Sequence, residues 1–137
     1  MLLIMEVVLA SLVFISLILW EFYSQTTASL LFFSSVTLAF FYMSVGVILF
    51  KAHKEKSFAI PLSIIASIGI ALSVIGILFK SLNWPGGMLQ LKVGLSLLFI
   101  IAILSFLLYL RTKSSVYLHL LVRSIIYSGV SAIVLLF

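Results

Sequence analysis

The sequence predicts an all-α, polytopic membrane protein whose five transmembrane helices form an antiparallel bundle with short loops. The first observation is the composition: 65% of the 137 residues are hydrophobic and 8% are charged, against about 45–50% and about 25% in a soluble domain. The second is that the apolar residues form runs of about 20 residues, the length that crosses ~30 Å of hydrocarbon as a helix. Because backbone groups in lipid must be hydrogen-bonded within their own segment, helices are predicted.

These apolar runs account for most of the chain and make one integral membrane domain, residues 1–137. They cover residues 1–20, 28–50, 58–79, 88–110 and 116–137. The fifth run is the least regular, because it spans only if it carries His119 and Arg123 in its first two turns. In the rival interpretation, residues 116–123 lie in the headgroup plane and the remainder is a re-entrant or buried stub.

The basic residues indicate the orientation of the chain. The second connection contains Lys51, Lys54 and Lys56, and the fourth contains Arg111 and Lys113, whereas the first connection has no Lys or Arg. Because cytoplasmic loops are enriched in basic residues, we expect the amino terminus in the cytoplasm and the carboxyl terminus outside. The net charge of +5 is thus a topology signal, and nucleic-acid binding is not expected.

A polar turn joins the third and fourth runs. The glycines permit a sharp reversal, the proline suits the first turn of a helix, Asn83 can cap with its side chain, and Trp84 is a typical headgroup anchor. The two flanking lysines can reach the same interface by snorkelling. Residues that could contact a partner at this turn are Lys80, Asn83, Trp84, Pro85, Gly86, Gly87 and Lys92.

The stretch "LFKSLNWPGGML", followed by Gly94, resembles the FK-x-x-HWPG-x-x-ML helical hairpin of the L subunit of the gliding-motility and type IX secretion motor. The resemblance covers about residues 72–96, and Asn83 stands where that family usually has His. It implies the inner membrane of a Gram-negative bacterium, with this turn on the periplasmic side. The motor subunit carries a glutamate in the helix after the turn, whereas "VGLSLLFIIAILSFLL" here has no carboxylate. The resemblance therefore implies the hairpin geometry and the cell type, and does not imply the motor function.

Small residues recur at steps of three and four and lie on one helix face. Such faces allow helix backbones to approach closely in lipid. We expect them to pack within this chain or against a partner. They are Ala66, Gly69, Ser73 and Gly76 on the third run and Ser124 and Ser128 on the fifth.

Several charged or polar side chains lie inside the runs. His119, Arg123 and Tyr127 share one helix face and could bind an anionic lipid head or a partner's acid, or could simply snorkel to the interface. Lys92 could pair with a carboxylate of another subunit or snorkel. Glu6, one or two turns from the cytoplasmic end and in reach of water, could be a transport site or could pair with Lys113 or Arg123.

The sequence contains no constellation typical of an enzyme. It has no cysteine, and its two histidines, His53 and His119, have no acids nearby to complete a metal site. We expect no catalysis, cofactor or metal. The prediction is an accessory or structural subunit of a larger bacterial inner-membrane complex, with other membrane proteins and lipids as partners. The alternative is a small oligomeric transporter or channel.

Overall fold

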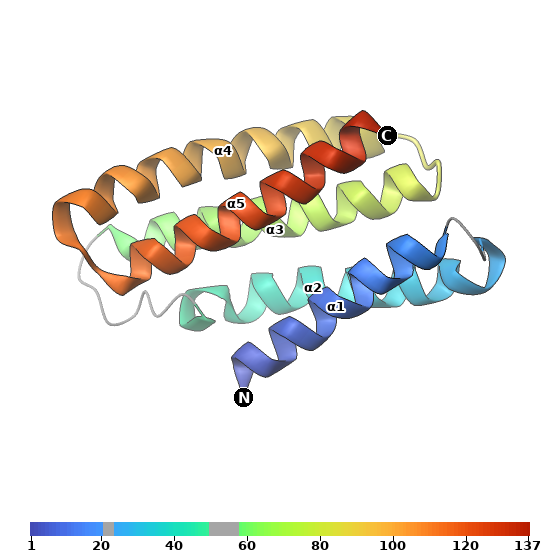
Figure 1. The fold of residues 1–137 in the computed structure, drawn as a ribbon, viewed down its shortest axis with the longest axis horizontal. Helices are drawn as coiled ribbons and strands as arrows, with labels where there is room; N and C mark the ends of the chain where they lie inside the picture. The colour runs from blue at the N-terminus through green and yellow to red at the C-terminus, as the bar shows by residue number, and fades with distance from the viewer. Residues whose placement is uncertain (21–23, 50–57) are drawn as a thin grey trace.

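The computed structural model describes residues 1–20, 24–49 and 58–137, and in these residues the chain forms five α-helices (Figure 1). They are α1 (Leu2–Trp20), α2 (Ser24–Leu49), α3 (Ala59–Ser81), α4 (Gly87–Thr112) and α5 (Ser115–Leu136). Each is long and apolar enough to cross a membrane. The predicted all-α, multi-pass membrane fold is confirmed. The predicted and observed helix boundaries differ most at the start of α2, which the sequence places at residue 28 and the structure at Ser24.

The helix α3 lies at the centre of the bundle and packs against α2, α4 and α5. In the most apolar stretch of α3, 67% of the residues are buried, whereas in that of α1 the share is 17%. The helix α1 lies at the periphery and packs mainly on α2. Many large apolar side chains on the outer faces are exposed, among them Phe33, Phe40 and Phe99. In a bilayer these faces meet lipid tails, so exposure carries no hydrophobic cost.

The backbones of α3 and α4 are in direct contact. A methyl group added at Gly76 would lie 2.8 Å from the backbone nitrogen of Leu91, and one added at Gly94 would lie 2.8 Å from that of Ser73. The predicted small-residue seam of α3 therefore packs within this chain. Gly69, Ser73 and Gly76 all face α4, and Ala66 is fully buried.

In the turn between α3 and α4, hydrogen bonds of the backbone end α3. Asn83 has a φ of 54°, its backbone N–H donates to Lys80 O, and Trp84 N–H donates to Phe79 O over 2.8 Å. This is the left-handed ending known as the Schellman motif, with the accompanying apolar contact between Trp84 and Phe79. The predicted side-chain cap by Asn83 is wrong, because Asn83 ends α3 through its backbone and no side chain caps α4.

Two other features of the turn follow from its backbone. Gly86, with a φ of 87°, is the N-cap of α4, so Pro85 precedes the helix and does not lie in its first turn as predicted. A Cβ at Gly87 would lie 2.6 Å from Lys80 N, which makes a glycine necessary there.

The fifth helix is continuous from Ser115 to Leu136. Its 22 residues rise about 33 Å at 1.5 Å per residue, enough to span the hydrocarbon. Lys80, near the end of α3, donates from Nζ to the carbonyl oxygens of Val134 and Leu135, the latter over 3.0 Å. The end of α5 thus reaches the level of the α3–α4 turn, and the interpretation as a buried stub is wrong.

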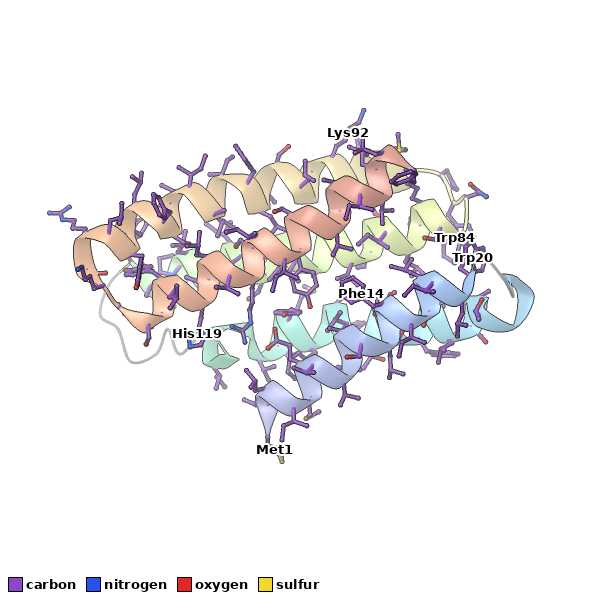
Figure 2. All side chains as sticks on the ribbon, viewed as in Figure 1. Met1, Phe14, Trp20, Trp84, Lys92 and His119 are labelled. Atoms are coloured by element: carbon purple, nitrogen blue, oxygen red, sulfur yellow. The ribbon has the colours of Figure 1, made fainter. Side chains whose placement is uncertain are left out.

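The two ends of the bundle differ in their polar residues. Trp20 and Trp84 lie at the same end (Figure 2), while Arg111, in the last turn of α4, and Lys113, which follows that helix, lie at the other. The two termini are also at opposite ends (Figure 1). Lys51, Lys54 and Lys56, which contributed to the predicted orientation, lie outside the described residues.

Candidate functional site

A buried ion pair joins the first and last helices. Glu6 on α1 accepts hydrogen bonds from Arg123 on α5, with Oε2 at 2.6 Å from Nη2 and Oε1 at 2.7 Å from Nε. The two residues are 7% and 8% exposed. Two parallel N–H···O bonds between a guanidinium and a carboxylate form the strongest common geometry for such a pair.

Two tyrosines complete this polar cluster. The hydroxyl of Tyr42, on α2, donates to Oε1 of Glu6. The hydroxyls of Tyr42 and Tyr127 lie 3.2 Å apart, and their rings meet edge to face with centroids 5.5 Å apart. Because a tyrosine has one hydroxyl hydrogen and that of Tyr42 is used by the carboxylate, Tyr127 is the donor between the two hydroxyls.

His119 extends the cluster toward the amino-terminal end of α5. Its Nδ1 lies 3.4 Å from Nη1 of Arg123. A guanidinium nitrogen can only donate, so Nδ1 accepts and the ring hydrogen of a neutral histidine is on Nε2. His119, Arg123 and Tyr127 lie on one face of α5, which faces α1 and α2.

These contacts correct the expected surroundings of two residues. We expected Glu6 to reach water and Arg123 either to snorkel or to bind a lipid head or a partner's acid. Both side chains are buried, and the acid that Arg123 contacts is Glu6 of the same chain. Of the two cations considered for Glu6, the structure forms the pair with Arg123. An unpaired charge in the bilayer is costly, and bidentate pairing offsets much of that cost.

An open cavity of about 300 Å³ lies beside the ion pair, between α1 and α5. Glu6, His119, Arg123 and Tyr127 line one part of it. The other lining residues are apolar: Leu3, Val7, Ala10, Phe14, Val122 and Ile126. The cavity thus combines a pair of opposite charges with walls suited to a hydrocarbon.

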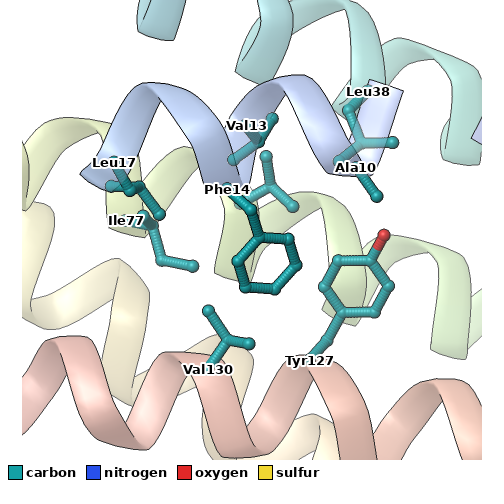
Figure 3. Close-up of a pocket in the computed structure, with 9 residues that line it drawn as sticks. Ala10, Val13, Phe14, Leu17, Leu38, Ile77, Tyr127 and Val130 are labelled. Carbon is teal, nitrogen blue, oxygen red and sulfur yellow. The ribbon is translucent and has the colours of Figure 1, made fainter. Parts of the chain in front are cut away.

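The space between α1 and α5 continues toward the other end of the bundle. Figure 3 shows Phe14 reaching from α1 to Val130 and Tyr127 on α5, which closes the middle. Beyond Phe14 lie two further open cavities, of about 220 and 230 Å³. Trp20 and Lys80 line the outermost one. Phe14 therefore divides a groove that follows the length of both helices.

The remaining predicted site residues are scattered. Lys92 is exposed and points away from the bundle (Figure 2), and Trp84 is 44% exposed at the same end. Ser124 is fully buried, whereas Ser128 is half-buried and donates to Ile125 O of its own helix. The turn and the Glu6 cluster lie at opposite ends of the helices and do not form one site.

Tyr42 is the member of the cluster that the sequence interpretation missed. It lies inside an apolar run, where a hydroxyl group needs a hydrogen-bond partner. This rule could have drawn attention to Tyr42, but it does not identify the partner, which is 36 residues away.

The side chains of the cluster can form hydrogen bonds and recognise charged groups. Among the described residues, no group of three His, Cys, Asp or Glu side chains could hold a metal ion. The carboxylate already accepts bonds from Arg123 and Tyr42.

Comparison with known proteins adds no family to this picture. No family model matches the chain, and no match is found among the curated proteins or the solved structures.

Proposed function

We propose that the protein is a non-catalytic, structural subunit of a larger assembly in a bacterial inner membrane. In this proposal the amino terminus is cytoplasmic and the carboxyl terminus periplasmic. Partners pack against its apolar outer faces, and the Trp-Pro-Gly turn contributes a contact at the periplasmic end. The hairpin resemblance described above supports the cell type, and the basic residues support the orientation.

The observation that carries the proposal is the position of Lys92. It is the sixth residue of α4, about 7.5 Å from the first at 1.5 Å per residue, and its side chain leaves the bundle (Figure 2). Its exposed neighbours Met88, Leu89 and Val93 are apolar. An ammonium group on such a face suits a carboxylate on a neighbouring membrane helix, because a charge inside the bilayer is stabilised by pairing.

The test is purification in a mild detergent followed by native mass measurement. We expect larger subunits to co-purify with the wild-type chain and to be lost in Lys92→Gln. Lys113→Gln is the matched control, since Lys113 is also exposed but lies at the opposite end. Equal loss or equal retention in both variants would contradict the role of Lys92.

A second candidate function is a small oligomeric transporter or channel, which the Glu6–Arg123 pair beside an open cavity favours. It predicts that the pure protein forms a homo-oligomer and moves ions or solutes in liposomes, and that Glu6→Gln abolishes this flux. That result would exclude the structural subunit as the main function.

A further inference from the structure

We propose that the cavity between α1 and α5 binds a phospholipid with a zwitterionic phosphoethanolamine head, its ammonium on Glu6 and its phosphate on Arg123 and His119. The cavity walls contain one carboxylate and one guanidinium in contact. Because these two side chains balance each other, a ligand with a single charge would add a charge that the pair does not balance. With a zwitterion, the ammonium lies next to Glu6 and the phosphate next to Arg123, so each charge has an opposite charge beside it. A site of low dielectric constant favours this arrangement.

The carboxylate has acceptor capacity for an ammonium group. A carboxylate offers about four lone-pair positions. Oε1 of Glu6 accepts from Arg123 Nε and from the Tyr42 hydroxyl, and Oε2 accepts from Arg123 Nη2. Oε2 can therefore take one more donor. A primary ammonium has N–H groups to donate there, whereas the quaternary ammonium of choline has none.

The other side of the pair presents donors suited to a phosphate. Arg123 carries only N–H donors, and His119 beside it has its ring hydrogen on Nε2 when Nδ1 faces the guanidinium. Both side chains line the cavity. Guanidinium N–H groups form charge-assisted hydrogen bonds with phosphate oxygens.

The polar residues of the site lie in the first three turns of α1 and α5. Glu6 and His119 are each the fifth residue of their helices, about 6 Å from the first residue at 1.5 Å per residue. Both helices begin at the same end of the bundle (Figure 1). Arg123 lies one turn further along α5, about 12 Å from the first residue of that helix.

In this proposal, the apolar part of the cavity contacts the acyl chain of the lipid. Val7 and Ala10 on α1 face Val122 and Ile126 on α5 across it. Val7 and Val122 are 56% and 45% exposed, so the space opens sideways toward the bilayer. Phe14 closes its inner end (Figure 3), which directs an acyl chain outward along the helices and away from the middle of the bundle.

The test measures lipid retention by native mass spectrometry of the full chain. Phosphatidylethanolamine, phosphatidylcholine and phosphatidylglycerol with identical acyl chains are the probes. We expect phosphatidylethanolamine to bind about tenfold more tightly than either of the others, the factor that one additional charge-assisted hydrogen bond typically gives. Equal binding of all three, or a preference for phosphatidylglycerol, would overturn the proposal.

The position of the site is tested by filling the cavity without changing the ion pair. Val122→Trp places an indole in the cavity, and Val93→Trp on α4 is the matched control, since Val93 is 44% exposed and lies outside it. We expect Val122→Trp to weaken phosphatidylethanolamine binding about tenfold and Val93→Trp to leave it unchanged. Val7→Trp fills the same space from α1 and covers the case in which Val122→Trp does not fold. Unchanged lipid retention in a folded cavity-filling variant would overturn the assignment.

Discussion

Oε2 of Glu6 and Nη2 of Arg123 lie 2.6 Å apart, although 117 residues separate them in the sequence. This contact connects the most exposed helix of the bundle to the last one. Apart from Glu6, the buried residues of α1 are Val13 and Ser16. Because lipid tails are as apolar as the helix faces, hydrophobic burial does little to hold α1 in place. The ion pair and the tyrosine that supports it therefore carry much of this connection.

The Tyr42 hydroxyl stabilises the carboxylate, so its removal should weaken the bundle. We expect Tyr42→Phe to reduce the free energy of unfolding by about 1 kcal/mol, within the range measured for hydrogen bonds between membrane helices. Tyr127→Phe should cost less, because the Tyr127 hydroxyl contacts the Tyr42 hydroxyl and not the carboxylate. Unfolding of both variants in one detergent provides the comparison, and a larger loss for Tyr127→Phe would contradict it.

The contact between α3 and α4 leaves no space for a methyl group at Gly76. We expect Gly76→Ala to destabilise the protein by about 1–3 kcal/mol, the usual cost of overpacking, since the added carbon meets the backbone of Leu91. Gly129→Ala is the control, because a Cβ there meets nothing within 4 Å. Thermal unfolding of the two variants should separate them, and equal stability would show that α3 and α4 are not in close contact.

Lys80 holds the end of α5 through its last carbonyl groups. We expect Lys80→Met to keep the packing of the side-chain stem but to loosen the final turn of α5, because the carbonyl oxygens of Val134 and Leu135 lose their donor. Amide hydrogen exchange should rise over the last turn of α5 and stay unchanged near Ser115. Unchanged exchange at the end of α5 would show that Lys80 does not cap this helix.

The fold could be predicted in outline because the length and apolarity of each run depend on the sequence alone. The small-residue seam was also visible, since Gly69, Ser73 and Gly76 share a helix face. The sequence did not reveal that this seam meets α4, because every helix in lipid presents similar apolar neighbours. Asn83 was misjudged because its side chain suggests a cap, while its tolerance of the left-handed conformation determines its role.

The candidate site could be predicted only in part. The face that contains His119, Arg123 and Tyr127 follows from helical spacing, and the pairing of Glu6 with Arg123 was one of two possibilities. Choosing between Arg123 and Lys113 required the position of α1 relative to α5 and to the end of α4, which tertiary packing determines. The cavity and the role of Phe14 depend on the separation of two helices that are distant in the sequence, and no local pattern encodes it.

The most direct test of the account is a double-mutant cycle of unfolding free energies for wild type, Glu6→Gln, Arg123→Gln and the double variant. We predict that each single variant is strongly destabilised, by about 3–5 kcal/mol for a buried partner left unpaired. We also predict that the double variant is no less stable than the worse single one, so the coupling energy is at least the smaller single loss, about 3 kcal/mol. If the two losses add within about 0.5 kcal/mol, the residues do not interact, and the ion pair does not hold α1 to α5.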